Sequence, residues 1–596
     1  MKHSIIVMFR SRSRLAFRLA FGFALILNLT GVEAATFTVN TTDDTSDADL
    51  GDGIAADLNG KCSLRAAIMQ ANFTSVIGPS NTIIIPAGVY TLTRPGDDDN
   101  AVLGDLDITQ PMTIQGAGAG LTIIDGNGAV TGDRVIQILS SAKETSLSGM
   151  TIRNGKKINI FDEGGGLYWE GGGGHLHLSD MIFENNAAYY GGGLYLNYSS
   201  GGDTVEMDHV IIRSNTATNA AAGGLGASFY DAAGFHMRNS QVYDNKAYEG
   251  GGISFQSSTS FGLTSVRIET TDIYSNTAVL SAGIENRSRD PNVPVLLLNS
   301  RVHGNAAGYY GGAIGNFGTL TIANTTIDAN SAGARGGGIY IEGATVSLTN
   351  STISGNSVTN GSGGGIFNGV AVLNVSSTLN LINCTIASNN AVGGFGGGIT
   401  NQSGNVGARS TIISGNAASS GPDFAGVLNT INSSYDIFGN TGGLSFSAGI
   451  PFGCQLNVNP KLGPLQDNGG PTFTHALLTG SPAIDAAGAS LGLRTDQRGA
   501  PRAVDDLAIP NANSGDGTDI GAFEFAQPQL AIQQADSAAV LSWPAYYGGF
   551  TLQSVANPIL SNGWATVAGT PVVSGDHYVF TNSPISGNQF YRLKGD

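Results

Sequence analysis

Residues 336–356 read GGGIYIEGATVSLTNSTISGN, and they contain both sequence markers that recur along this chain. The first marker is a run of two or three small residues, mostly glycine, followed by Leu or Ile. Its apolar residues, spaced by 25 to 33 positions, are Leu167, Leu194, Leu225, Ile253, Ile284, Ile314, Ile339, Ile366 and Ile399. The second marker, apolar-x-x-Asn, ends at Asn185, Asn215, Asn245, Asn276, Asn305, Asn330, Asn356, Asn389 and Asn416. Two markers that share one period indicate one structural unit stacked many times.

Each unit also contains short runs of β-branched residues with alternating polarity, such as 319–322 and 345–348, which predict strands with one inward face. A unit of this length cannot bury that face alone, but stacked units can share one apolar column. No segment with helical spacing lies between the strands. We therefore predict an all-β fold, a right-handed parallel β-helix solenoid with three short strands per turn. We expect the asparagines to form a ladder at one corner and the glycines to mark another.

The N-terminus has the composition of a secretory signal. Five basic residues precede the apolar run 19–27, and Val32, Glu33 and Ala34 follow it. This pattern predicts a signal peptide over 1–34 and a secreted or cell-surface protein, associated with the outer membrane. The apolar run is shorter than the ~20 residues that a spanning helix needs, so we expect no membrane span after cleavage.

The charge of the chain limits its partners. The formal net charge is −17, and removal of residues 1–34 changes it to −21. A surface of this sign repels nucleic acid and anionic lipid, and it suits polyuronates poorly unless a divalent cation bridges the two. Only Cys62, Cys384 and Cys454 are present, so we expect no disulfide framework, and Cys384 is predicted to be a small inward-facing residue.

Two segments resemble known families. Residues 62–72, CSLRAAIMQAN, resemble the CSLREA-type N-terminal motif of secreted bacterial β-helix proteins, with Ala66 where that name has Glu. The phrases NPKLG at 459–463, DNGGPT at 467–472, GSPAID at 480–485, TDQRG at 495–499 and DIGAFE at 519–524 resemble the choice-of-anchor Q domain. The coils between them look like polymorphic outer-membrane-protein and pectate-lyase-like repeats. These resemblances imply an exported surface protein and no particular reaction.

The chain is thereby divided into five parts. After the signal peptide we predict an N-terminal cap with the CSLREA-like motif over 35–79, with a helix around 64–72 that covers the first coil. The parallel β-helix follows over 80–460 and the choice-of-anchor Q-like region over 461–527. Alternating strands around Trp543 and Trp564 predict a small β-sandwich over 528–596, of immunoglobulin or fibronectin type.

The candidate sites are few. Tyrosines that precede glycine clusters on alternate coils are candidates for binding a sugar chain, with loop packing as the alternative. They are Tyr189, Tyr190, Tyr248, Tyr309 and Tyr310. The acidic run with Asp47, Asp49 and Asp52 is interpreted as solvated loops, with calcium as the alternative, and we predict no other cofactor.

Catalytic residues are not predicted. The acids within the repeats show no basic partner in register, among them Asp162, Glu163, Glu170, Glu249, Asp272 and Asp328. Asp485, Asp496, Arg498 and Glu524 are interpreted as a structural ion-pair cluster, with a calcium site as the alternative. The leading hypothesis is a non-catalytic adhesin or scaffold that binds extracellular polysaccharide or surface glycans. The alternative is a polysaccharide lyase, hydrolase or epimerase. No pattern indicates an oligomeric state.

Overall fold

A computed structural model of the chain describes residues 34–74, 80–231, 233–257, 265–288, 290, 293–369, 376–489, 492–526, 528–535, 538–545, 550–558, 563–575, 577–582 and 588–595. The predicted signal peptide covers residues 1–34, of which 1–33 lie outside the described residues. Across the described ranges, no helix has the length and apolarity that a membrane crossing requires.

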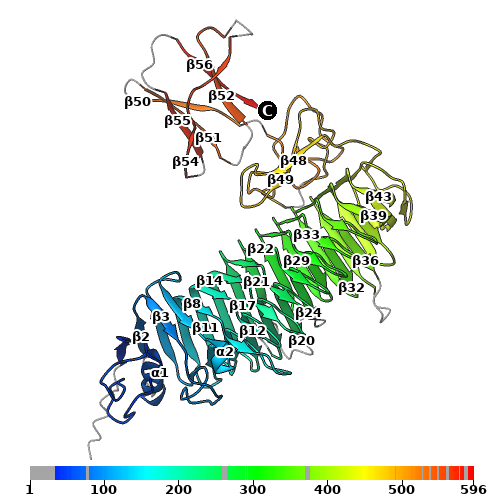
Figure 1. The fold of residues 1–596 in the computed structure, drawn as a ribbon. Helices are drawn as coiled ribbons and strands as arrows, with labels where there is room; N and C mark the ends of the chain where they lie inside the picture. Colours follow the sequence, from blue (N-terminus) through cyan, green and yellow to red (C-terminus); the bar gives the residue numbers. More distant parts are fainter. Residues whose placement is uncertain are drawn as a thin grey trace, which may run out of the picture.

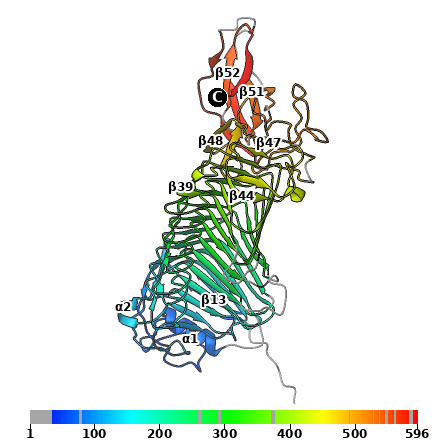
Figure 2. The same ribbon diagram turned by 90° about the vertical axis from the view of Figure 1, so that its right-hand side faces the viewer.

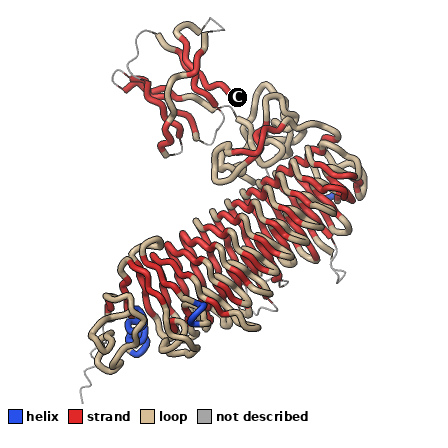
Figure 3. The backbone as a smooth tube through the Cα atoms, in the orientation of Figure 1, coloured by secondary structure: helices blue, strands red, loops and turns tan. Residues whose placement is uncertain are grey.

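Three parallel sheets wind into a β-solenoid, which carries a separate β-sandwich after it (Figure 1). The predicted parallel β-solenoid followed by a small β-sandwich is therefore confirmed. Helices are confined to short segments at the edge of the strand stack (Figure 3).

Sheet A has 24 strands and already begins within the segment predicted as the cap, because β1 pairs with β2. Its strands are β1 (Thr36–Thr38), β2 (Asn81–Ile85), β3 (Gly88–Thr91), β5 (Met112–Gly116), β6 (Thr122–Asp125), β8 (Glu144–Arg153), β11 (His175–Glu184), β14 (Asp203–Arg213), β17 (Ala233–Arg238), β18 (Gln241–Tyr243), β21 (Ser265–Glu269), β22 (Asp272–Tyr274), β25 (Val295–Leu298), β26 (Arg301–His303), β29 (Thr319–Ala323), β30 (Thr326–Asp328), β33 (Thr345–Thr349), β34 (Thr352–Ser354), β37 (Thr378–Ile382), β38 (Thr385–Ala387), β41 (Asn405–Arg409), β42 (Ile412–Ser414), β45 (Ile437–Phe438) and β47 (Gln455–Leu456).

Sheets B and C close the solenoid. Sheet B contains β4 (Leu106–Ile108), β7 (Ile136–Ile138), β10 (Leu167–Glu170), β13 (Leu194–Tyr198), β16 (Leu225–Phe229), β20 (Ile253–Ser257), β24 (Ile284–Ser288), β28 (Ile314–Asn316), β32 (Ile339–Glu342), β36 (Ile366–Gly369), β40 (Ile399–Asn401), β44 (Phe424–Leu428) and β46 (Leu444–Phe446). Sheet C contains β9 (Lys156–Lys157), β12 (Ala187–Ala188), β15 (Thr216–Ala217), β19 (Lys246–Ala247), β23 (Thr277–Ala278), β27 (Ala306–Ala307), β31 (Ser331–Ala332), β35 (Ser357–Val358), β39 (Asn390–Phe395) and β43 (Ala417–Ser420).

The apolar residues of the first marker form one column of the core. All nine are at most 1% exposed, and each lies in register with the next, as Ile284 does with Ile314 and Ile314 with Ile339. Side chains alternate along a strand, so the residue after each of them faces outward. The first marker therefore also defines which residues form the outer face of sheet B.

The second marker forms a ladder of buried asparagines, as predicted, with one correction. The Asn ladder consists of Asn186, Asn215, Asn245, Asn276, Asn305, Asn330, Asn356, Asn389 and Asn416. Asn305 donates from its backbone N and from Nδ2 to Asn330 Oδ1, at 3.0 and 2.9 Å. The predicted member Asn185 is wrong by one position, because Phe183 and not Ile182 is in register with Ile212.

The ladder residues themselves do not adopt the left-handed backbone conformation. The left-handed conformation belongs to the residue before each ladder position, such as Asn185 (φ 55°) and Ala329 (φ 54°). This turn directs the following amide into the core. At its last rung, Asn416 donates from backbone N and Nδ2 to Asp423 Oδ1, at 3.0 and 2.9 Å.

Glycines form another corner, as predicted, for two physical reasons. Gly336 has φ +61°, which favours glycine, and a Cβ on Gly338 would lie 2.6 Å from the carbonyl oxygen of Gly365 in the next coil. Asn and Gly are thus scaffold at these corners. Cys384 is fully buried, as predicted, and all three cysteines are free thiols.

The N-terminal end of the solenoid is covered by helix α1 (Leu64–Phe73), which confirms the helix predicted around 64–72. Ser63 caps it by accepting from the Ala66 N–H. The buried Arg65 guanidinium donates to Asp44 and to the carbonyl oxygens of Ala101, Gly104 and Asp105, which fixes the helix to the first coils. A second short helix, α2 (Gly128–Thr131), lies beside β9.

Residues 461–526 fold back against sheet A, with β48 (Leu462–Gln466) and β49 (Thr474–Leu477) as an antiparallel pair after the 3₁₀ turn η1 (Thr430–Asn432) (Figure 2). Thr352 Oγ1 donates to Gln497 Oε1 at 2.6 Å. Ser354 Oγ lies 2.8 Å from His475 Nε2. These contacts lie between strands of the solenoid and a segment more than 100 residues later in the chain.

The last segment forms the β-sandwich from two antiparallel sheets, with Trp543 buried between them. Its strands are β50 (Ala531–Ala535), β51 (Ala538–Pro544), β52 (Phe550–Val555), β53 (Ala565–Thr566), β54 (Val572–Ser574), β55 (His577–Asn582) and β56 (Phe590–Gly595).

Candidate functional site

The outer face of sheet B carries a row of aromatic and polar side chains in register. Going along the solenoid, the row directly after the core column is Tyr168, Tyr195, Gly226, Ser254, Glu285, Gly315, Tyr340, Phe367 and Thr400. Gly226 is required here, because a Cβ at that position would lie 2.7 Å from the Tyr195 ring. Aromatic rings occupy this row on the coils of Tyr168, Tyr195, Tyr340 and Phe367, and the four positions between them carry Gly, Ser or Glu.

A pocket of about 530 Å³ opens over the middle of this face. It is lined by the ends of β16, β20 and β24 and by two aromatic residues from the next coil. The Arg287 pocket, as we call it, consists of Ser228, Phe229, Tyr230, Gln256, Ser257, Arg287, Tyr310 and Phe317. A concave site with a few polar groups among aromatic rings is the usual form of a small-ligand site.

The Arg287 side chain connects two carboxylates beside the pocket. Its Nη2 lies 2.6 Å from Glu249 Oε1, and its Nε donates to Glu285 Oε1 at 3.1 Å. The Glu285 side chain is fully buried, and its Oε2 has no hydrogen-bond partner within the described residues. Glu249 and Arg287 are 17% and 38% exposed. Solvent and ligand can therefore reach the Glu249–Arg287 pair and not Glu285.

Burial shifts the protonation of these groups. Desolvation raises the pKa of Glu285 to about 7, against the stabilising charge of Arg287. Desolvation also raises the pKa of Glu249, again opposed by Arg287. The pKa of Tyr310 is raised to about 12 by burial and by the nearby Glu285 charge, so its hydroxyl stays protonated. Groups with shifted pKa values beside a pocket are typical of functional sites, although structural ion pairs produce them too.

The expectation that the repeat acids lack basic partners in register is wrong. Glu249 pairs with Arg287, Asp328 with Arg301 at 2.7 Å, and Asp272 with His303 at 3.0 Å. The partner in each case comes from a neighbouring coil. Coil length varies between 25 and 33 residues, so the sequence separation of two adjacent side chains is not constant and the pairs escape a periodic search.

The five tyrosines predicted to bind glycan fall into three places. Tyr190 contacts Tyr189 and Tyr195, with ring centroids 5.0 and 6.3 Å apart. Tyr310 lines the Arg287 pocket and stacks on Tyr340 at 4.5 Å. Tyr248 and Tyr309 are 47% and 49% exposed. Tyr190 and Tyr310 thus contribute to packing, while the rings of Tyr248 and Tyr309 are open to solvent.

Sequence reasoning missed Tyr195, Tyr340, Phe367 and Arg287, although the sequence carried a signal for three of them. Tyr195, Tyr340 and Phe367 each directly follow a core residue of the first marker, where alternation places a side chain on the outer face. Arg287 has no such marker.

The predicted acidic calcium site has another visible role in the structure. Asp47, Asp49 and Asp52 each accept a hydrogen bond from the backbone N–H two residues later. These are the turns that aspartate forms in loops. Among the described residues, no group of three or more His, Cys, Asp and Glu side chains is arranged to hold a metal ion. Calcium at this position stays a prediction.

The acidic cluster of the folded-back segment contains the predicted structural pairing. Arg498 Nη2 lies 2.7 Å from Asp496 Oδ2, and both side chains are buried. Glu524 pairs with Arg502, at 3.2 Å, an arginine that the sequence analysis did not single out. Asp485 instead accepts from the Asp506 N–H.

The arrangement defines a class of protein, a parallel β-solenoid with an aromatic, hydrogen-bonding pocket on the outer face of one sheet. No protein-family model and no curated protein matches the sequence. The A-module of the mannuronan C-5 epimerase AlgE6 from Azotobacter vinelandii is similar in structure, with 13% identity, a TM-score of 0.29 and coverage of 69% of this chain and all of that one. A mannuronic-acid-specific polysaccharide family 6 lyase from human gut microbiota gives 12% identity, a TM-score of 0.22 and coverage of 67% and 86%.

Proposed function

We propose that this is an exported surface protein that binds an extended polysaccharide along the outer face of sheet B, with the Arg287 pocket as the main contact. The observation that carries the proposal is the pocket itself, in which hydroxyl, amide and guanidinium groups lie between aromatic rings. Sugar rings have apolar faces that pack on aromatic rings and hydroxyls that both donate and accept hydrogen bonds.

The extent of sheet B, which has 13 strands, favours a long ligand over a compact one. The outward row continues in register over nine coils, from Tyr168 to Thr400. All of these residues except Tyr168 are buried, so a chain along the solenoid axis would contact exposed side chains beside the row, such as Tyr230 at the pocket. The five tyrosines of the sequence analysis remain candidate contacts, with Tyr248 and Tyr309 offering the most exposed rings.

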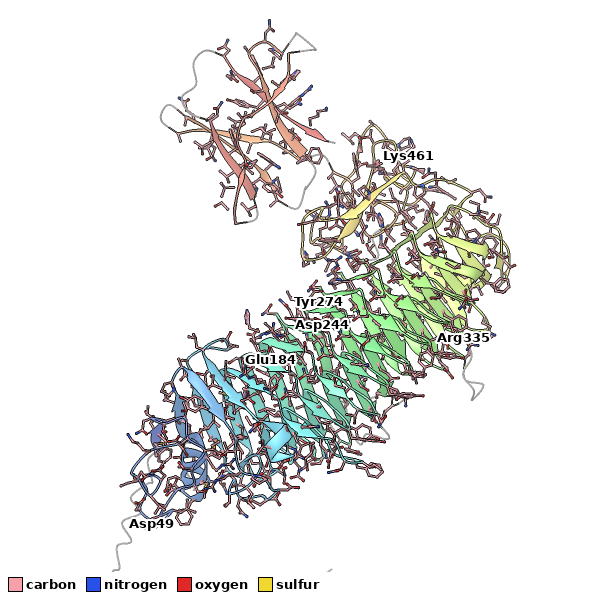
Figure 4. The ribbon with its side chains drawn as sticks, viewed as in Figure 1. Asp49, Glu184, Asp244, Tyr274, Arg335 and Lys461 are labelled. Atoms are coloured by element: carbon pink, nitrogen blue, oxygen red, sulfur yellow. The ribbon has the colours of Figure 1, made fainter. Side chains whose placement is uncertain are left out.

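Affinity electrophoresis of the mature chain in gels that contain soluble polysaccharides tests the proposal. We expect retardation in at least one gel, and we expect Tyr230→Ala to remove most of it, because Tyr230 lines the pocket and is 49% exposed. Tyr274→Ala is the matched control, since Tyr274 (Figure 4) lies on β22 of sheet A and does not line the pocket. Equal loss in both variants, or retardation by no polysaccharide, would refute the proposal.

A second candidate function is a chemical step on the same polysaccharide, as in a lyase, hydrolase or epimerase. The observation that favours it is Glu249, a partly exposed carboxyl that is paired with Arg287 beside the pocket and whose pKa is raised by burial. Incubation with the retained polysaccharide, followed by detection of new reducing ends, unsaturated products or altered sugar composition, tests it. We expect any such activity to be lost in Glu249→Gln, and turnover that survives this change would exclude the assignment.

A further inference from the structure

We infer that the Arg287 pocket takes an uncharged sugar unit and discriminates against uronic acids, a selectivity that rests on the proposed polysaccharide function. The geometry points to this choice because the one charged residue in the pocket lining is already paired on two sides.

Two carboxyl groups of the protein already occupy the positions on Arg287 that an anionic ligand would need. Its Nη2 contacts Glu249 at 2.6 Å and its Nε contacts Glu285 at 3.1 Å. A carboxylate ligand would have to displace Glu249 or stand beside two acidic side chains. Like charges at such distances repel by several kcal/mol when they are partly shielded from water, on the order of 4 kcal/mol at about 4 Å. A sugar hydroxyl meets no such repulsion.

The other polar groups of the pocket are neutral. Ser228, Gln256 and Ser257 come from the ends of neighbouring strands, and the hydroxyls of Tyr230 and Tyr310 complete the set. Ser228 Oγ is 2.6 Å from Tyr195 Oη, so its orientation is fixed by the outward row. Groups that can both donate and accept suit vicinal hydroxyls, each of which also does both. The Arg287–Glu249 pair adds one charged donor next to one charged acceptor, which such a diol can bridge.

Around the pocket, acidic side chains outnumber basic ones. Arg134 lies 5.0 Å from the centre of the Tyr168 ring and Arg335 lies 5.2 Å from that of Phe367, so both pack against aromatic rings of the row. Glu163, Glu170 and Glu342 lie along the same side of the solenoid. The whole chain carries a net charge of −17. The field along this face therefore disfavours a polyanion at long range as well.

Calorimetric titration of the mature chain with matched oligosaccharides tests the inference. The ligands are uncharged glucan, mannan and xylan oligomers and, at equal length, oligomers of alginate and pectate. We expect at least one uncharged series to bind at least roughly tenfold more tightly than either uronate, a difference of about 1.4 kcal/mol. We also expect the affinity for the uncharged ligand to change little with salt, because no net charge is neutralised.

One substitution should reverse the preference in part. Glu249→Gln leaves the Arg287 guanidinium with one carboxylate fewer, so uronate affinity should rise while affinity for the uncharged ligand falls. Glu206→Gln, an exposed change on sheet A, is the control and should alter neither. The unfolding midpoint of each variant shows whether it is folded.

The outcomes separate the two proposals. Binding of uncharged ligands with uronate gain in Glu249→Gln supports the inference. Tighter binding of uronates by the unchanged protein overturns the inference and leaves polysaccharide binding intact. Absence of binding by either class overturns the proposed function and, with it, the inference.

Discussion

Arg287 Nη2 lies 2.6 Å from Glu249 Oε1, although the two residues are 38 positions apart in the sequence. Glu249 directly precedes the glycine corner of one coil, and Arg287 lies on β24 of the following coil. Glu285, two residues before Arg287 on the same strand, meets the guanidinium from its other side. One arginine therefore holds two carboxyl groups whose protonation differs from that of exposed glutamate.

Glu285 should make the stability of the protein depend on pH. Its pKa is raised from 4.5 to about 7 in the folded state, so the folded state binds the proton more tightly than the unfolded state does. This contribution is complete below pH 4.5 and is lost as the pH rises through about 7. Relative to Glu285→Gln, the free energy of unfolding of the wild type should fall by up to about 3 kcal/mol across that window.

Urea unfolding of both proteins at a series of pH values measures this difference. Glu206→Gln serves as the control, because its side chain is exposed and its curve should run parallel to the wild type. A constant difference between wild type and Glu285→Gln at all pH values would contradict the expected protonation.

The Asn ladder permits a test between adjacent residues. Asn186 is 1% exposed, accepts from the Gly155 N–H and donates to Asn215 Oδ1 and to the Ile152 carbonyl. Asn186→Ala leaves these groups unpaired in the core and should cost roughly 3 to 5 kcal/mol. Asn185→Ala removes an exposed side chain at φ 55° and should cost only about 1 to 2 kcal/mol.

Chemical denaturation of the two variants decides which asparagine belongs to the ladder. Asn185→Gly is a further control and should restore stability, since glycine adopts the left-handed conformation without strain. Equal losses in Asn185→Ala and Asn186→Ala would show that the register is misassigned.

Gln497 should determine whether the folded-back segment stays on the solenoid. It accepts from Thr352 and donates to Thr326 and Thr472, so it joins two strands of sheet A to residues 461–526. Gln497→Ala leaves buried hydroxyls unpaired, and we expect protease cleavage within 461–526 to become at least roughly tenfold faster, since a loss of 1.4 kcal/mol raises the open population by that factor. Gln402→Ala, an exposed glutamine, should leave the rate unchanged. No acceleration in Gln497→Ala would mean that other contacts hold the segment.

Tyr309 and Tyr310 should separate packing from ligand binding. Tyr310 stacks on Tyr340 and contacts Phe317, so Tyr310→Ala should lower the free energy of unfolding by about 2 to 3 kcal/mol. Tyr309 is 49% exposed and its ring meets Tyr310 at 5.5 Å, so Tyr309→Ala should lower stability less than Tyr310→Ala does, while it weakens polysaccharide binding by about 1 kcal/mol. Unfolding curves and the gel retardation assay measure the two effects, and an unstable Tyr309→Ala would remove the distinction.

The sequence predicted the solenoid because its determinants repeat. The glycine corner, the core column and most of the Asn ladder each need one residue type at one position of every coil, as Ile314 and Ile339 illustrate. The ladder was misplaced at Asn185 because Ile182 and Phe183 are both apolar and either could be the inward residue. Only pairing with the next coil decides between them.

The candidate site was predicted less well because it does not repeat. Tyr310 is part of the pocket and was identified from its glycine neighbours, whereas Arg287 and Gln256 occur there once. Their proximity to Glu249 and Tyr310 depends on the lengths of the loops between coils, and alternation alone does not predict those. A unique site on a repetitive scaffold is set by the departures from the repeat.

The contact between Asn416 and Asp423 has a consequence for how the number of coils in the Asn ladder can change during evolution. Every side-chain amide of the Asn ladder points its hydrogens the same way. The dipoles of these amides therefore add, and the last amide presents positive charge to the group that follows it. A carboxylate in that place, only seven residues on, satisfies both hydrogens and offers none in return. Whole turns could therefore be gained or lost upstream without disturbing the terminus, while any deletion across 416–423 would leave the array open-ended. A single aspartate therefore terminates the array of amides, while sheets A and B continue beyond it through β44 to β47.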